Sequence, residues 1–380
     1  MRQLAHIEKI ISLEPIVGAD RIEVCKILGW DVVVQKGLHK VGDLVCYIET
    51  DSILPKIPTF FFMEPRKYRV KIIKLRKQIS MGLIISLDDI VKAFGERFNN
   101  TCGIYKHNLK EGDDVTEKLG IIKHDPQAKN EASLQEQKNM NPIHKYLLKY
   151  KWYRAIQPKK HGRWPNWIVK TDEERIQNIP SILTKRADTL VYWSEKLDGQ
   201  SASYSLKNTN YLPLLSRILN TKTFTVCSRN IWLKRPSNQS YWEIAKKYDL
   251  EQKLKAYNKE LVIQGEICGP GIQKNKYQLK ELDFYVFNIF DLKTNLRLGC
   301  QDMQKVAGEL GLKTVPILGQ GILKEIGKTV PDLVKLSTGK SVLYNRQREG
   351  IVVRSALTIN EPLSFKVINP EFLLNLEEDE

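Results

Sequence analysis

A short apolar run that ends in Lys-Leu-Asp-Gly constrains the fold of this chain more than any other stretch. Residues 190–193 read Leu-Val-Tyr-Trp, which is typical of a β-strand, and Lys-Leu-Asp-Gly closes the run at residues 196–199. Side chains two apart in an extended segment point to the same face. We therefore expect Lys196 and Asp198 to share one pocket while Leu197 packs behind them.

The residue types in this run suggest chemistry on a phosphate. A lysine beside a carboxylate, with a glycine that permits close backbone approach, suits a nucleophilic amine aimed at a phosphorus atom. The string is short, and a surface lysine before a turn is the alternative interpretation. Other parts of the chain must decide between the two.

The charge of the chain points to a polyanionic partner. Its 380 residues carry a formal net charge of +16, which is typical of proteins that bind nucleic acid, although a lysine-rich source proteome would also produce it. No apolar run is long enough to span a membrane, and the first residues lack the apolar core of a signal peptide. The six cysteines show no metal or disulfide-exchange spacing. We expect reduced thiols and an intracellular protein, with the cytoplasm favoured over the nucleus.

The sequence predicts two domains joined by a linker. Residues 1–123 contain short alternating strands, which favour a small OB-like barrel that binds nucleic acid. Residues 124–149 have the polar composition of a linker. Residues 150–380 mix strands and helices and contain neither a P-loop nor a GxGxxG motif, so we expect an α+β domain.

Hydrophobic periodicity gives the individual elements. Strands are predicted at residues 22–27, 31–35, 44–48, 261–267, 284–292, 350–353 and 363–368. Helices are predicted at residues 240–257, 301–310 and 331–336.

A basic stretch in the first domain predicts contact with RNA. Residues 66–77 alternate cations with Tyr68 and branched aliphatic residues, as expected of one strand that carries a row of cations matched to a phosphate backbone. A solvated strand face is the alternative. The candidate RNA-binding residues are Arg69, Lys71, Lys74 and Arg76.

Five stretches after the opening run supply partners for the lysine. Arg229 follows a predicted strand, and Glu266 lies in an apolar strand, where a carboxylate is costly unless it is paired or ligating. Phe287 lies in a strand with aromatic residues on both faces. Glu349 precedes a glycine at the start of one strand, and Lys366 lies within the next.

This order of stretches resembles the covalent nucleotidyltransferase superfamily of ATP-dependent ligases and mRNA capping enzymes, whose motifs I, Ia, III, IIIa, IV and V it matches in register. Within the superfamily the chain is similar to the RNA ligase 5 family, which has an N-terminal OB domain. Residues 170–178, Lys-Thr-Asp-Glu-Glu-Arg-Ile-Gln-Asn, support this resemblance. Residues 367–380 are too few for an OB domain after motif V.

The resemblance implies an α+β fold: a nucleotidyltransferase domain (ATP-grasp-like ligase adenylation domain) of antiparallel sheets and helices, preceded by a small all-β OB-like barrel. It implies an ATP-dependent RNA ligase that uses Mg²⁺ or Mn²⁺. Lys196 would attack the α-phosphorus of ATP, expel pyrophosphate and carry AMP. The AMP would pass to an RNA 5′-phosphate, from which a 3′-hydroxyl would displace it. The expected partner is RNA with such ends, a nicked duplex in RNA repair, bound by a monomer.

The resemblance also assigns roles to residues. The AMP and ATP site would comprise Glu195, Asp198, Gly199, Arg229, Glu266, Phe287, Glu349 and Lys366, with Lys170 and Arg175 as further candidates for the ATP tail. Asp198, Glu266 and Glu349 would hold the metal, directly or through water. Phe287 would stack on adenine, with Phe284 and Phe290 as alternative rings.

The reaction needs a neutral amine, whereas free lysine has a pKa of about 10.4. We expect the metal and nearby cations such as Lys366 to favour the neutral form. Motif V often carries Lys-x-Lys, but Ser364 and Ile368 flank Lys366 at that spacing. A second phosphate-binding lysine must therefore come from elsewhere or be absent.

Two other functions are compatible with these patterns. One is a DNA ligase or mRNA guanylyltransferase of the same superfamily, which the choice of nucleotide and of RNA or DNA ends would distinguish. The other is a non-catalytic RNA-binding protein with an OB module and a degenerate second domain, which would form no covalent nucleotide adduct.

Overall fold

The chain divides into two compact units. The computed structural model describes residues 3–98, 108–124, 146–147, 149–150, 161–162, 164–170, 172–208, 222–233, 239–257 and 259–378. Unit 1 comprises Met1–Arg154, Gln177–Pro180 and Leu373–Glu380, and unit 2 comprises Ala155–Ile176 and Ser181–Phe372. The expected linker at residues 124–149 lies almost entirely outside the described residues. The expected domain boundaries therefore stay a prediction.

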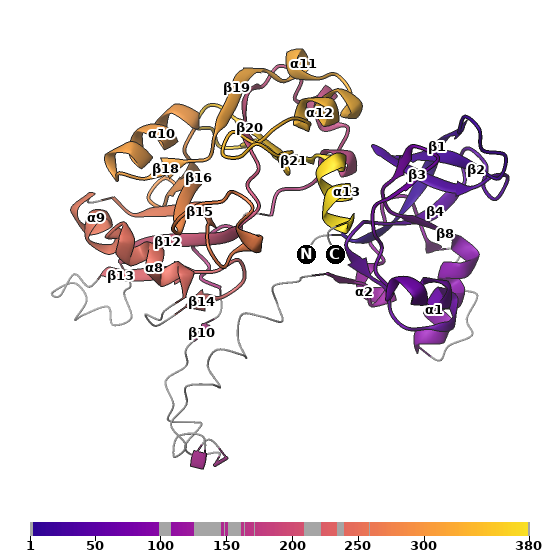
Figure 1. Ribbon diagram of the computed structural model, residues 1–380, viewed down its shortest axis with the longest axis horizontal. Helices are drawn as coiled ribbons and strands as arrows, with labels where there is room; N and C mark the ends of the chain where they lie inside the picture. The colour runs from indigo at the N-terminus through magenta and orange to yellow at the C-terminus, as the bar shows by residue number, and fades with distance from the viewer. Residues whose placement is uncertain are drawn as a thin grey trace. The chain divides into compact units, whose positions relative to one another are not determined.

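Unit 1 is built on an antiparallel sheet of five described strands in the order β3-β2-β1-β4-β8 (Figure 1). These strands are β1 (Ala5–Pro15), β2 (Ile22–Ile27), β3 (Trp30–Gln35), β4 (Leu44–Ile48) and β8 (Leu83–Ser86). The short strands β5 (Ser52–Ile53) and β9 (Ile122–Lys123) pair with each other, as do β6 (Ile73–Leu75) and β7 (Gln78–Ser80). The helices described between residues 3 and 124 are the 3-10 helix η1 (Pro58–Arg66), α1 (Leu87–Phe98) and α2 (Thr116–Leu119).

Strand β1 gives this unit its curvature. It pairs with β4 through its first half and with β2 through its second, and the register shifts between Ile10 and Ser12. An irregularity of this kind bends a strand and increases its twist, so one sheet can cover two apolar clusters. Phe60 anchors one cluster and Trp30 the other. The result is the OB-like half-barrel that the sequence predicts.

The prediction of one strand at residues 66–77 is wrong. Arg66 ends η1, and Lys67 and Tyr68 have φ angles of 51° and 59°, which break any extended strand. Only residues 73–75 form a strand, β6, and it turns back into β7 after Arg76. The expected row of cations on one strand edge therefore does not exist.

Unit 2 contains two sheets. The larger comprises seven described strands in the order β10 (His161–Gly162), β14 (Trp232–Leu233), β13 (Lys222–Cys227), β12 (Gln200–Asn208), β15 (Leu261–Cys268), β16 (Asp283–Asp291) and β17 (Leu296–Arg297), with β18 (Lys313–Thr314) parallel to β16. The smaller comprises β19 (Ile317–Ile322), β11 (Leu190–Glu195), β20 (Gly350–Ser355) and β21 (Ser364–Ile368), all antiparallel.

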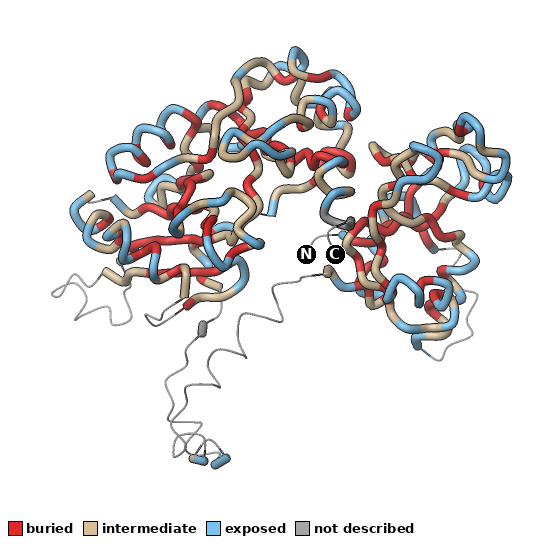
Figure 2. The backbone as a smooth tube through the Cα atoms, viewed as in Figure 1, coloured by how far each residue is buried: buried red, intermediate tan, exposed pale blue. Residues whose placement is uncertain are grey.

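Helices pack on the larger sheet. The helical segments among the described residues from 176 onward are η3 (Ile176–Asn178), α6 (Ile182–Lys185), α8 (Ser240–Lys247), α9 (Leu250–Tyr257), η4 (Gln273–Asn275), α10 (Cys300–Glu309), α11 (Leu323–Ile326), α12 (Val330–Ser337) and α13 (Pro370–Glu378). Residues of α8, α9 and α10 share one apolar cluster with β12, β15 and β16. Figure 2 shows these strands buried and the outer faces of α9 and α10 exposed. No described helix has the length and apolar character needed to cross a bilayer.

The predicted elements of unit 2 are found within about two residues of their expected ends, with one correction. Residues 240–257 form two helices, because Asp249 adopts a φ of 49° between α8 and α9. Ile244 and Leu254 both enter the same core, so the apolar spacing continues across the break and suggests one helix.

The core of the larger sheet is expected to determine the stability of unit 2. Phe284 is fully buried on β16, with its ring 5.2 Å from that of Tyr204 in an edge-to-face arrangement. We expect Phe284→Ala to lower the free energy of unfolding by about 3–5 kcal/mol, because it leaves a cavity. Leu357→Ala, at a side chain that is 60% exposed, should change it by less than about 0.5 kcal/mol. Denaturant unfolding measures both, and equal effects would contradict this view of the core.

Candidate active site

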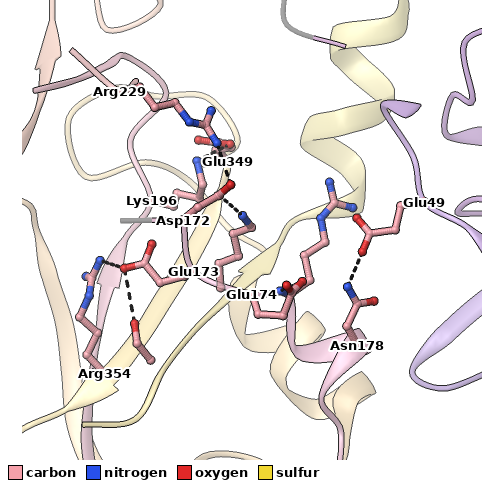
Figure 3. A network of polar contacts seen from close by, with 12 residues as sticks. Glu49, Asp172, Glu173, Glu174, Asn178, Lys196, Arg229, Glu349 and Arg354 are labelled. Atoms are coloured by element: carbon pink, nitrogen blue, oxygen red, sulfur yellow. Dashed lines mark hydrogen bonds and ion pairs between the residues drawn. The ribbon is translucent and has the colours of Figure 1, made fainter. Parts of the chain in front are cut away.

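Lys196 lies directly after β11, where the smaller sheet holds its backbone. Its amide donates to the carbonyl of Gly350 at 3.0 Å, at the start of the neighbouring strand β20. Its Nζ donates to Glu349 Oε1 at 2.6 Å (Figure 3). The pairing of β11 with β20 thus brings together two residues that are 153 positions apart.

Gly350 keeps Glu349 in this position. Gly350 has a φ of +153°, and a Cβ there would lie 2.2 Å from the carbonyl oxygen of Val367 on β21. Any other residue would strain the backbone and separate β20 from β21. The glycine after this strand carboxylate is therefore required by the close approach of two strands.

Gly199 links the lysine to the larger sheet. Its amide donates to Glu266 Oε1 at 3.1 Å, and a Cβ on Gly199 would lie 2.3 Å from the carbonyl oxygen of Ile267. Leu197 packs behind the run against Cys268, as expected. The backbone of Gly199 thus lies close to the backbone of β15. A direct contact between Gly199 and ATP stays a prediction.

Asp198 is held by two residues that sequence reasoning missed. Lys276 Nζ forms an ion pair with Asp198 Oδ2, and the Asp198 amide donates to the Tyr277 hydroxyl at 2.7 Å. Both residues follow the Gly-Pro-Gly turn, in a stretch where Lys274 and Gln278 have positive φ. Such a stretch has no hydrophobic periodicity, so its position ten residues after Glu266 in the chain is the one sequence signal that could have pointed to Lys276.

Three carboxylates determine the charge of Lys196. Burial lowers the pKa of the lysine, but the negative charges of Glu349, Glu266 and Asp198 outweigh burial and raise the pKa above its ordinary value. Burial is also the largest cause that raises the pKa of Glu266 to about 8, and repulsion from Glu349 and Asp198 adds to it. The protein groups around Lys196 therefore favour its charged form, and the expected effect of a metal ion on this amine stays a prediction.

The same carboxylates are suited to a divalent ion held through water. Glu349 Oε2 is buried without a hydrogen-bond partner in the described part of the chain. No group of three acidic, histidine or cysteine side chains among the described residues is arranged to ligate one ion directly. Carboxylate oxygens that do not surround an ion on all sides are suited to Mg²⁺ or Mn²⁺, because Mg²⁺ usually keeps several of its own water ligands.

Glu195 and Phe287 border this site. Glu195 is buried; its Oε2 accepts from the Val342 amide at 2.8 Å, and its Oε1 has no partner among the described residues. Phe287 is partly buried in the same apolar cluster as Leu197, whereas Phe284 lies in the core of the larger sheet. Phe290 packs in a separate cluster. Of the three rings, Phe287 is therefore the one that lies beside the Lys-Leu-Asp-Gly run.

Asp172 joins two residues of the predicted nucleotide site. Its Oδ1 lies 3.1 Å from Lys366 Nζ, and its Oδ2 lies 3.1 Å from Arg229 Nη2 (Figure 3). Lys366 is buried on β21, whereas the Arg229 side chain is half exposed. One carboxylate therefore occupies the position between two cations that were expected to contact nucleotide or RNA.

The residues after Asp172 run along β21. Lys366 donates its amide to the Glu174 carbonyl at 2.8 Å, and Arg175 forms a parallel bridge with Lys366. Arg175 thus lies beside the predicted phosphate lysine, while Lys170 lies over the ring of Trp164, 5.8 Å from its centroid. Nothing in the sequence pattern identified this segment as an added edge of the smaller sheet.

Glu173 secures the segment from its other side. It forms an ion pair with the buried Arg354 of β20, and Ser364 also donates to it (Figure 3). The Arg354 guanidinium lies 5.4 Å from the centroid of the Phe287 ring. This pair connects the predicted phosphate side of the site to the predicted adenine side.

The candidate RNA-binding residues of unit 1 divide into two groups. Arg69 forms an ion pair with Asp51 at 2.9 Å, so its charge is already balanced. Lys71 is partly buried. Lys74 and Arg76 are exposed on the β6–β7 hairpin and remain available to phosphate groups.

Comparison with known families identifies both domains. The RNA ligase family model matches residues 189–368, and an OB-fold domain model matches residues 4–87. No curated protein matches the chain. Together the two matched regions cover the smaller sheet, most of the larger sheet and the half-barrel.

Solved structures of one enzyme match nearly the entire chain. An apo variant of Naegleria gruberi RNA ligase is 29% identical, with a TM-score of 0.78 over 99% of each chain. A variant of that enzyme with ATP and Mn is 28% identical, with a TM-score of 0.78 over 98% of this chain and 99% of that one. The same enzyme with PPi is 28% identical, with a TM-score of 0.77 over 100% of both. Residues 189–368 are thus similar to the RNA ligase family, residues 4–87 ahead of them are similar to an OB-fold domain, and nearly the entire chain is similar to a solved RNA ligase.

Proposed function

We propose that this protein is an ATP-dependent RNA ligase that uses Lys196 as its nucleophile. The observation that carries the proposal is the contact of Lys196 Nζ with Glu349 at 2.6 Å, with Glu266 and Asp198 close enough to shift the lysine pKa. The related Naegleria gruberi enzyme has been solved with ATP and Mn, with AMP and Mn, and with PPi. These ligands support ATP and a divalent ion as the cofactors of this chain.

In the first step Lys196 Nζ forms a bond to the α-phosphorus of ATP, and the bond from that phosphorus to pyrophosphate breaks. The amine must lose a proton, yet the three surrounding carboxylates favour the charged form. Asp198, Glu266 and Glu349 would hold Mg²⁺ or Mn²⁺ through its waters. When bound, the ion supplies positive charge that offsets these carboxylates and lowers the pKa of the amine.

Lys366 and Arg229 would bind phosphate after they leave Asp172. Each cation already contacts one oxygen of the Asp172 carboxylate. The two oxygens of a carboxylate accept contacts from cations much as two oxygens of a phosphate group do. Lys366 would balance charge on the α-phosphate, and Arg175, beside it, would reach the ATP tail. Arg229 or Arg175 would then be the second phosphate-binding cation that motif V itself lacks.

The opposite side of the site would bind adenine. Phe287 offers a ring face next to Leu197, and Arg354 fixes the orientation of that ring. The buried Glu195 Oε1 can accept a hydrogen bond from the exocyclic amine of adenine. A guanine base presents a carbonyl oxygen at that position, so this residue favours ATP over GTP.

The substrate would be RNA with 3′-hydroxyl and 5′-phosphate ends, held as a nicked duplex and sealed in RNA repair by a monomer. The OB-fold domain supports a nucleic-acid partner, because OB folds commonly bind single strands. The exposed Lys74 and Arg76 would contact its phosphates. An intracellular location, with the cytoplasm favoured over the nucleus, is proposed from the cysteine pattern.

The proposal predicts a covalent adduct. Wild-type protein incubated with radiolabelled ATP and Mg²⁺ should form a protein–AMP adduct, whereas Lys196→Ala should form less than about one ten-thousandth as much, because it lacks the amine that would bond to the α-phosphorus. Gel electrophoresis and peptide mapping of the label measure this. Lys293→Ala, at an exposed lysine, is the matched control and should behave as wild type.

The same preparations test the substrate. A nicked duplex with an RNA 3′-hydroxyl strand should be sealed, and a matched nick with a DNA 3′-hydroxyl strand should be sealed more slowly. An adduct that survives in Lys196→Ala would refute the nucleophile. An adduct formed from GTP in place of ATP, or faster sealing of the DNA nick, would favour one of the alternative enzymes.

The raised pKa of Glu266 predicts a pH-dependent stability in the metal-free protein. The pKa is about 8 in the folded protein against 4.5 ordinarily, so the folded state favours the protonated form. The stabilisation from this group is therefore full below pH 4.5 and is lost as the pH rises through 8. Denaturant unfolding with a chelator should show Glu266→Gln gaining stability relative to wild type between pH 5 and 8. A constant difference across that range would contradict the assignment.

A further inference from the structure

Helix η1 exposes two adjacent phenylalanines. It contains three in a row, of which Phe60 is fully buried in the unit 1 core together with Met63. Phe61 and Phe62 are 53% and 56% exposed. One of the three rings thus packs in the core. The other two expose apolar surface to water, which is unfavourable, and packing within unit 1 gives no reason for it.

The exposed pair lies on a well-anchored element. At the start of η1 the Thr59 amide donates to Glu96 of helix α1 at 2.9 Å. At its end the Lys67 amide donates to the Glu64 carbonyl, and Tyr68 donates to the Met63 carbonyl. Both ends are fixed, so the two rings are presented in a defined position rather than on a loose loop.

The surrounding sequence is strongly basic. Between residues 52 and 87 the one acidic residue is Glu64, whereas eight are basic: Lys56, Arg66, Lys67, Arg69, Lys71, Lys74, Arg76 and Lys77. Lys56, Arg66 and Lys67, nearest to the phenylalanines in the chain, are all exposed. Aromatic rings flanked by cations are the combination that binds unpaired nucleotides, with bases stacked on the rings and phosphates paired with the cations.

We propose that Phe61 and Phe62 form a stacking platform for unpaired RNA bases, such as those of a single-stranded segment next to the site of sealing, with Lys56, Arg66 and Lys67 binding the adjacent phosphates. The inference rests on the proposed function only in taking RNA as the substrate. Two side chains cover far less area than the roughly 1,000 Å² that a specific protein interface buries, and the positive charge opposes self-association. RNA therefore fits this surface better than a second protein does.

The test is a double variant, Phe61→Ala with Phe62→Ala, and a matched control, Phe98→Ala, whose ring is 54% exposed on helix α1 of the same unit. The probes are a fluorescein-labelled 20-nucleotide oligoadenylate RNA and a blunt RNA duplex of equal length. The double variant should bind the single strand at least about tenfold more weakly, because each base stack contributes roughly 1–3 kcal/mol. Its duplex affinity should change less than about twofold, and Phe98→Ala should bind both probes as wild type does.

Further measurements separate the possible outcomes. Phe61→Tyr with Phe62→Tyr keeps both rings and should restore single-strand binding, which distinguishes stacking from misfolding. Unchanged single-strand affinity in the alanine double variant would overturn the proposal, as would an equal loss in Phe98→Ala. Dimerisation that the double variant abolishes, measured by sedimentation, would assign the surface to a second copy instead. Adduct formation with ATP needs no RNA, so its absence in wild type would refute the proposed function and leave the binding result to stand alone.

Discussion

The contact between Lys196 and Glu349 is the interaction on which the rest of the site depends. It exists because β11 and β20 are neighbours in the smaller sheet and because Gly350 lets β21 approach closely. Gly199 makes a similar approach to β15 and brings Glu266 to the same lysine. The two sheets thus place Glu349 and Glu266 near the Lys196 amine. Each placement requires a glycine, Gly350 or Gly199, at a position where a Cβ atom would collide with backbone.

This arrangement has an electrostatic consequence. In the ligand-free site Lys196 pairs with Glu349, Lys276 with Asp198, and Lys366 with Asp172. Every one of these cations is balanced by a carboxylate, so the lysine that should attack is held in its charged form. Binding of a nucleotide and a divalent ion would exchange these partners: phosphate would replace Asp172 as the anion for Lys366, and the ion would offset the carboxylates near Lys196. Under the proposed function, these residues would become reactive only when nucleotide and a divalent ion are bound.

Sequence reasoning reached the parts of this site that follow strands. Lys196, Glu266, Glu349 and Lys366 could be placed because each lies in or beside a periodic apolar run, and strand pairing brings such runs together. Lys276 and Asp172 could not, since they come from segments without periodicity whose position is set by tertiary contacts. The basic stretch at residues 66–77 misled for the same reason: its alternation suggests a strand, but left-handed residues divide it into a helix end and a hairpin.

The central claim is that three carboxylates hold Lys196 as an ammonium ion and that a divalent ion relieves this. Competitive labelling with an amine-reactive reagent across a pH series, read out by mass spectrometry of the Lys196 peptide, measures the pKa of this amine directly. Lys293, which is exposed, serves as the internal reference. Without a divalent ion the Lys196 pKa should lie above the ordinary 10.5, and Mg²⁺ should lower it while leaving Lys293 unchanged. A Lys196 pKa at or below 10.5 that Mg²⁺ does not shift would contradict the account.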